Sequence, residues 1–170
     1  VFYNRALRER EFVLDSQDSL KSVVLPGPGN LNETKINGQR LDYGVCDRPT
    51  PTLNVVVFDA ITLDAWSTRY VPTGSNLNRN YGNSNDNGAC RPRPIGFFSF
   101  PQTSSTYLNA LQDMVVNKIP DSNYVLIYTS FGANFNAWDT YAPSLYSMFS
   151  SLGSDSIRPG RKNYSFSFFF

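Results

Sequence analysis

The chain has 170 residues, a net charge of +1, and 41% hydrophobic but only 17% charged residues. This length and apolar content predict one folded domain with a sizeable core and exclude a disordered chain. The near-zero net charge argues against a nucleic-acid partner, and no apolar run approaches the roughly 20 residues that a membrane-spanning helix needs.

Residues 1–51 are predicted to form an N-terminal extension of short strands and turns ahead of the main domain, which spans residues 52–170. One or two short strands that lie against the main body are expected before Pro26-Gly27-Pro28-Gly29-Asn30, a segment that breaks regular structure. Asn37-Gly38 is a favoured turn dipeptide and predicts a hairpin that joins residues 34–36 to residues 40–42.

The main domain begins with a continuous apolar run from Leu53 to Asp59, which predicts a buried central strand. Residues 62–71 alternate between apolar and polar side chains, so a partner strand is expected after a short turn. Residues 72–96 are rich in Asn and Gly and predict a long loop inserted into the domain. A further strand is expected from Gly96 to Phe100.

Two helices and two further strands are predicted after the strand that ends at Phe100. Residues 104–118 carry apolar side chains at three- and four-residue spacing, which is typical of a helix with one apolar stripe. Residues 124–129 predict a second buried strand, and residues 131–141 predict an aromatic loop. Residues 143–152 predict a second helix that ends at Gly153, before a closing strand over residues 164–170. The order of elements predicts a compact α/β (α+β) domain.

The chain contains two cysteines, Cys46 and Cys90. Its Asn- and aromatic-rich composition favours an extracellular setting, where the two thiols are expected to form a disulfide. Such a bridge would tie the long loop to the sheet and stabilise the fold by roughly 3–4 kcal/mol, whereas two buried thiols are the alternative. Asn32-Glu33-Thr34 and Asn163-Tyr164-Ser165 match the N-glycosylation pattern, which matters only in a source that glycosylates such sites.

The inventory of reactive side chains argues against an enzyme. The chain has no histidine, which excludes Ser-His-Asp and Cys-His catalysis and histidine metal sites. No Gly-rich phosphate loop is present, so no cofactor is expected. Asp59 and Asp64 could serve a carboxylate-dependent glycoside hydrolase, but turn capping through backbone N–H groups is the favoured interpretation. Residues 83–88 imitate half of a calcium loop without its acids, so no metal site is predicted.

Aromatic residues in the two predicted loops give the clearest binding signal. Exposed flat rings can stack on the apolar face of a sugar while nearby amides and carboxylates bond its hydroxyl groups. The predicted ligand-binding residues are Trp138, Tyr141, Phe135 and Tyr81 as stacking rings, with Asn136 and Asp139 as polar partners. The alternative is that these rings fold back and cover the sheet or an interface with another domain.

A set of short motifs occurs in a characteristic order along residues 52–170. The motifs are Leu53 to Asp59, Gly96 to Phe100, Leu111 through Ile119-Pro120-Asp121, Tyr124 to Ile127, Leu152-Gly153-Ser154 and Arg161 to Phe166. In this order the chain resembles the interleukin-like EMT inducer domain, also called the PANDER-type domain. The resemblance implies a secreted, non-catalytic domain with a mixed β-sheet flanked by helices. It also implies relatives among cytokine-like secreted proteins, bacterial surface proteins and a sugar-binding stem.

The function expected from the residues and the resemblance together is that of a non-catalytic extracellular or cell-surface binding module for carbohydrate or a protein surface. A structural domain that docks against neighbouring domains of the same larger protein is the second hypothesis. The chain starts without Met and ends in Phe168-Phe169-Phe170, which favours a mature product or a piece of a larger protein. The carboxylate-dependent hydrolase is the third hypothesis.

Overall fold

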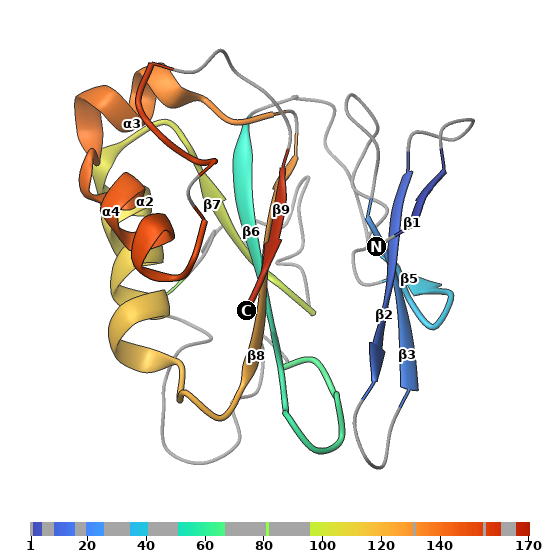
Figure 1. The fold of residues 1–170 in the computed structure, drawn as a ribbon. Helices are drawn as coiled ribbons and strands as arrows, with labels where there is room; N and C mark the ends of the chain where they lie inside the picture. The colour runs from blue at the N-terminus through green and yellow to red at the C-terminus, as the bar shows by residue number, and fades with distance from the viewer. Residues whose placement is uncertain are drawn as a thin grey trace, which may run out of the picture.

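The computed structural model describes residues 2–4, 9–15, 20–25, 35–40, 51–66, 81, 96–130, 132–154, 156–160 and 166–170. Three layers are visible in it: an N-terminal sheet, a central sheet, and helices on the far face of the central sheet (Figure 1). The predicted Cys46–Cys90 disulfide, the calcium-like segment 83–88 and the glycosylation motifs at Asn32 and Asn163 lie outside the described residues, so they stay predictions.

The N-terminal sheet is built from five antiparallel strands in chain order. They are β1 (Phe2–Asn4), β2 (Glu9–Asp15), β3 (Leu20–Leu25), β4 (Lys35–Ile36) and β5 (Gln39–Arg40). Ile36 pairs with Gln39 across the tight turn Asn37-Gly38, whose φ angles of 50° and 76° are those that a two-residue hairpin turn requires. The predicted hairpin is therefore confirmed over the described residues 35–40.

The central sheet has four strands in the spatial order β7-β6-β8-β9. Its members are β6 (Thr52–Phe58), β7 (Phe98–Pro101), β8 (Tyr124–Ser130) and β9 (Ser167–Phe169). With the helices beside it, this sheet confirms the predicted α+β class. Every pair of neighbouring strands is antiparallel, so the described sheet lacks the mixed strand directions that the resemblance implied.

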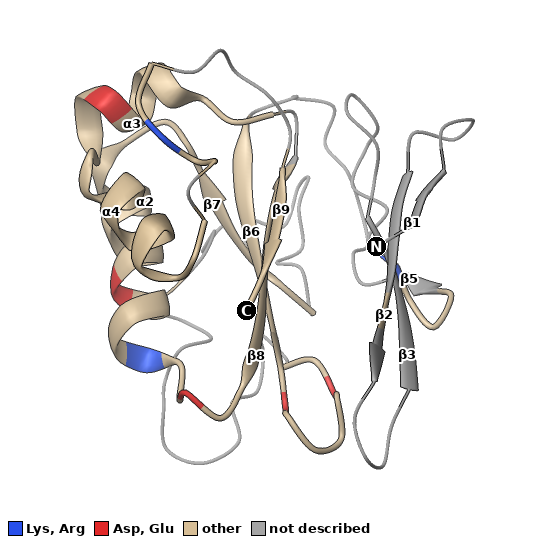
Figure 2. Cartoon of the chain, in the orientation of Figure 1, with Lys and Arg blue, Asp and Glu red and all other residues tan. Residues whose placement is uncertain are grey.

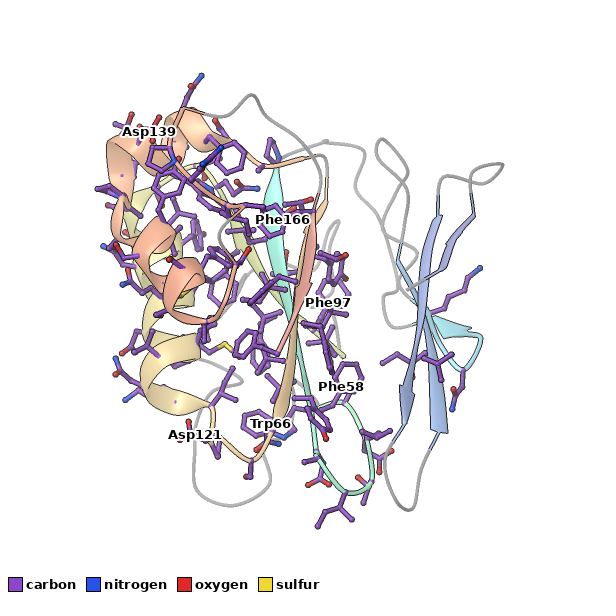
Figure 3. The ribbon with its side chains drawn as sticks, viewed as in Figure 1. Phe58, Trp66, Phe97, Asp121, Asp139 and Phe166 are labelled. Atoms are coloured by element: carbon purple, nitrogen blue, oxygen red, sulfur yellow. The ribbon has the colours of Figure 1, made fainter. Side chains whose placement is uncertain are left out.

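The central strand β6 is buried on both faces, as its apolar run predicts. Because side chains alternate along a strand, Leu53, Val55 and Val57 join the core beneath the helices. Val56 and Phe58 join a second cluster on the opposite face. There Phe58 and Phe97 project toward the side on which the N-terminal sheet lies (Figure 3).

The helix predicted at 104–118 is confirmed in two parts, α2 (Ser105–Asp113) and the π-helical turn η1 (Met114–Lys118). The wider turn is closed by the N–H of Ile119, which donates to the carbonyl oxygen of Met114 at 3.1 Å. The second predicted helix is also confirmed as α4 (Ser144–Ser151), and Gly153 follows its C-cap with a φ of 93°.

Two predicted elements differ from the structure. The aromatic loop predicted at 131–141 is wrong over most of its length, because α3 (Phe135–Tyr141) forms there. A partner strand is predicted over residues 62–71. Its described part, residues 62–66, instead forms a turn with one isolated bridge between Phe58 and Ala65. Leu63 adopts φ of 56° in this turn and is fully buried, so core packing holds a backbone conformation that its side chain disfavours.

Strand β5 ends at Arg40 and β6 begins at Thr52. The division of the chain into residues 1–51 and 52–170 stays a prediction, as does the loop insertion at 72–96, of which Tyr81 and Gly96 are described.

None of the described helices combines the length and the apolar character that crossing a membrane requires.

Candidate functional site

Helix α3 is anchored by Gln102, a residue with no exposed surface that directly follows β7. Its Oε1 accepts hydrogen bonds from the backbone N–H of Asn134 and from Nε1 of Trp138, both at 2.7 Å. Its Nε2 donates to the carbonyl oxygen of Gly132 at 3.0 Å. Asn134 caps the helix in turn, because its Oδ1 accepts from the N–H of Ala137 at 3.2 Å. These bonds fix where α3 begins and which face it buries.

Trp138 and Phe135 lie in the core, so their predicted exposure as stacking rings is wrong. Their exposed fractions are 0% and 1%, and the two rings meet edge to face with centroids 5.0 Å apart. Trp138 also stacks on Phe149 of α4 at 5.7 Å. The hydrogen bond to Gln102 removes the usual reason for an indole to stay at the surface. Both rings instead lie in the core beside the sheet, in agreement with the alternative in which they fold back and cover it.

Tyr81 is also buried, with 9% of its surface exposed, and its hydroxyl donates to the carboxylate of Asp113 at the end of α2. The same carboxylate accepts from Nδ2 of Asn117 at 2.8 Å. Burial and the bond to Asp113 raise the pKa of Tyr81 to about 12, while the hydrogen bond from Tyr81 lowers the pKa of Asp113. The ring of Tyr81 therefore lies buried against α2, where it is not the exposed stacking surface that was predicted.

The other three predicted binding residues are exposed on α3. Asn136 and Asp139 are three positions apart, so they lie on the same side of the helix. Tyr141 is 46% exposed at the helix end. Of the predicted set, the structure brings Asn136 and Asp139 together and separates them from the buried rings.

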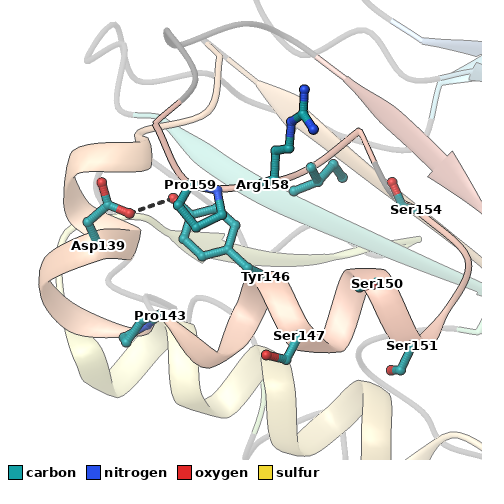
Figure 4. Close-up of a pocket in the computed structure, with 10 residues that line it drawn as sticks. Asp139, Pro143, Tyr146, Ser147, Ser150, Ser151, Ser154, Arg158 and Pro159 are labelled. Atoms are coloured by element: carbon teal, nitrogen blue, oxygen red, sulfur yellow. Dashed lines mark hydrogen bonds between the residues drawn. The ribbon is translucent and has the colours of Figure 1, made fainter.

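Asp139 lies at one end of a groove that runs along α4, and we call this site the α4 groove (Figure 4). Its volume is about 860 Å³. The lining residues are Asp139, Pro143, Tyr146, Ser147, Ser150, Ser151, Ser154, Ile157, Arg158 and Pro159. Small serine side chains on the outer face of α4 leave this space open beneath the segment that follows the helix.

The polar groups of the α4 groove are of two kinds. Asp139 is a carboxylate acceptor, and its Oδ1 accepts a hydrogen bond from the Tyr146 hydroxyl at 2.8 Å (Figure 4). Arg158 supplies a cation, and the serines supply hydroxyl groups that can donate or accept. Pro143, Ile157 and Pro159 add apolar surface, so the groove offers both polar and apolar contacts.

Sequence reasoning missed Arg158 and the serines of this groove. Arg158 belongs to a local basic group that reads as a solvated face, and serine alone carries no binding signal. The spacing of Ser147, Ser150 and Ser154 does place them along one side of a helix and its extension. That spacing becomes informative only when the segment after α4 is seen to pass over them.

Asp59 has a structural role that agrees with the favoured interpretation. Its Oδ1 accepts from the backbone N–H of Ile61 at 2.9 Å and of Thr62 at 2.8 Å. These bonds, that from Thr62 first, lower the pKa of Asp59, although a catalytic acid needs a raised pKa. The prediction that Asp59 caps a turn is confirmed, while Asp64 is an exposed residue of the same turn.

Within the described part of the chain, no group of three or more Cys, Asp and Glu side chains is placed so that it could hold a metal ion.

No protein-family model matches the chain, and neither the curated proteins nor the solved structures contain a significant match. The resemblance to the interleukin-like EMT inducer domain therefore stays a prediction, and the α4 groove is the feature from which a function can be argued.

Proposed function

We propose that this protein is a non-catalytic, extracellular binding module that recognises carbohydrate in the α4 groove. The observation that carries the proposal is the combination of side chains in one groove: Asp139, Arg158 and the serines beside Pro143, Ile157 and Pro159. A sugar presents hydroxyl groups at its edge and C–H groups on its faces, so it needs hydrogen-bonding groups and apolar surface in the same site.

The proposal changes the predicted manner of binding. Trp138 and Phe135 are core residues, and the ring of Tyr146 is only 7% exposed, so stacking on a broad aromatic face is not the main contact. Pro143 and Pro159 supply the apolar surface instead. Asp139 keeps its predicted role as a polar partner, with one carboxylate oxygen already oriented by Tyr146.

A groove-filling substitution tests this function. Ser147 is exposed on α4, and Ser147→Trp would occupy the groove without disturbing the core. We expect glycans that bind the unmodified protein on an array to lose at least about tenfold in affinity for Ser147→Trp, measured by calorimetry. Thr106→Trp is the matched control, because Thr106 is exposed on α2 outside the lining of the groove.

The result that contradicts the proposal is equally direct. If no glycan binds the folded protein, or if Ser147→Trp and Thr106→Trp bind a glycan equally well, the groove is not a carbohydrate site. Thermal unfolding of both variants establishes that lost binding does not reflect lost structure.

The docking-domain alternative has one observation in its favour. Tyr124 of β8 and Phe169 of β9 pack together with centroids 5.6 Å apart, yet remain 36% and 39% exposed. Partly exposed aromatic pairs are common at protein interfaces. If a longer piece of the parent polypeptide protects both residues from solvent while the α4 groove binds no glycan, the docking function replaces the carbohydrate proposal.

A further inference from the structure

Ser154 is the most informative residue of the α4 groove. It lines the groove while only 7% of its surface is exposed. Its backbone N–H donates to the carbonyl oxygen of Phe149 at 2.8 Å, which ends α4 and fixes the position of the residue. Its hydroxyl group has no hydrogen-bond partner among the residues that the structure describes. The hydroxyl therefore has a donor available, and a ligand group that accepts from it gains a hydrogen bond at a position that the backbone holds in place.

Arg158 follows four residues later and lines the same groove. Its side chain is exposed and forms no ion pair with any described residue. Between residue 51 and the end of the chain, the described cations are Arg158 and Lys118, drawn in blue in Figure 2. Lys118 is the last residue of η1 and does not line the groove. Among the described residues that line the groove, Arg158 therefore provides the positive charge.

Ile157 lies between these two groups and is 4% exposed. Its buried side chain anchors the segment that carries Ser154 and Arg158, so the two donors are held on a supported backbone.

We infer that the α4 groove selects an acidic sugar, with the carboxylate or sulfate group of that sugar accepting from Ser154 Oγ and the guanidinium of Arg158. This inference rests on the proposed carbohydrate function and adds the charge of the ligand. Guanidinium groups bind planar or multi-oxygen anions through paired N–H donors. Asp139 at the other end of the groove disfavours a second anionic group, so the bound segment carries one acidic residue next to a neutral one.

Three disaccharide probes test the charge requirement. They are a galactose disaccharide that ends in galacturonate, the methyl ester of that disaccharide, and a galactose disaccharide that ends in a sulfate ester. We expect at least one acidic probe to bind about tenfold or more tightly than the methyl ester, because the ester removes the charge and keeps the sugar. The affinity of that acidic probe should fall with added salt. The tighter of the two acidic probes identifies the anionic group.

Two variants assign the effect to the named side chains. Arg158→Gln should reduce the affinity for the acidic probe about tenfold or more and leave methyl-ester binding unchanged, whereas Arg158→Lys should retain part of the preference. Ser154→Ala should weaken acidic-probe binding without lowering the thermal unfolding temperature, since the hydroxyl has no partner among the described residues. Lys118→Gln is the control cation and should bind all probes normally.

The outcomes separate this inference from the proposed function. If the methyl ester and both acidic probes bind equally well, the acidic preference is wrong while carbohydrate binding stands. If the acidic preference survives in Arg158→Gln, the assignment to Arg158 is wrong. If no probe and no arrayed glycan binds, the proposed function itself fails and the inference fails with it.

Discussion

The positions of individual residues in the sequence determine which aromatic side chains of this domain are buried. The sequence places Phe135, Trp138, Ala142, Leu145 and Phe149 at alternating spacings of three and four, which is the signature of a buried helical stripe. Pro143 interrupts that stripe and favours a loop interpretation, although α3 and α4 in fact continue it on both sides of the proline. The spacing therefore indicates that these aromatic residues lie in the core. It does not show that Trp138 can be buried because its indole N–H finds an acceptor.

That acceptor, Gln102, leads to a prediction about stability. Gln102→Leu leaves the indole N–H of Trp138 and the N–H of Asn134 without their acceptor. Each unsatisfied buried donor costs roughly 1–3 kcal/mol, so we expect the free energy of unfolding to fall by about 2–4 kcal/mol in urea denaturation.

A double-mutant cycle provides the control for Gln102. Trp138→Phe removes the indole donor, so Gln102→Leu should cost less in the Trp138→Phe background than in the unmodified protein. Additive losses in the cycle would show that the bond between Gln102 and Trp138 contributes nothing of its own.

At the scale of elements, long and regular patterns were predicted well and short irregular ones were not. The strands β6 and β8 and the helices α2 and α4 follow from apolar runs and helical spacing that extend over several residues. The π-helical turn η1 has the same apolar spacing as an α-helical turn, so no pattern distinguishes it. The turn after Phe58 depends on the burial of Leu63, a tertiary effect that local sequence does not encode.

The contact between Tyr81 and α2 predicts how stability depends on pH. A tyrosine has a pKa of about 10 in the unfolded chain, whereas folding raises the pKa of Tyr81 to about 12. Between these values the folded state retains a proton that the unfolded state loses, so the free energy of unfolding falls as the pH rises from 10 to 12. We expect the part of this fall that is due to Tyr81 to be missing in Tyr81→Phe, as measured by urea denaturation across this range.

A second variant ties the alkaline effect to the hydrogen bond itself. Asp113→Asn removes the carboxylate that accepts from the Tyr81 hydroxyl, so it should also reduce the alkaline loss of stability. Identical pH profiles for the unmodified protein and both variants would contradict the assignment of the effect to this pair.

At the scale of the whole molecule, the central sheet has two apolar faces and needs a cover on each. The helices cover one face, and the apolar sides of α2 and α4, which the sequence pattern predicted, face this core. The opposite face carries Val56, Phe58, Phe97, Leu126 and Tyr128, each with at most 1% of its surface exposed. Ile36 of the N-terminal sheet belongs to the same cluster. The N-terminal strands are expected from the sequence to lie against the main body, but local periodicity does not show which of their residues reaches this core.

Ile36 therefore tests whether the two sheets stabilise one another. Its side chain is 9% exposed on β4, whereas Val13 on β2 of the same sheet is 52% exposed. Truncating a buried isoleucine to alanine typically costs about 2–5 kcal/mol, whereas an exposed position costs about 0.5 kcal/mol or less. We expect Ile36→Ala to lower the free energy of unfolding by at least about 2 kcal/mol and Val13→Ala to leave it nearly unchanged, in a single cooperative transition.

Equal small effects of the two substitutions would mean that the central sheet is stable without this contact. A separate early transition in Ile36→Ala would instead show that the N-terminal sheet unfolds as an independent unit, because a side chain shared by one cooperative core cannot destabilise only one of its sheets.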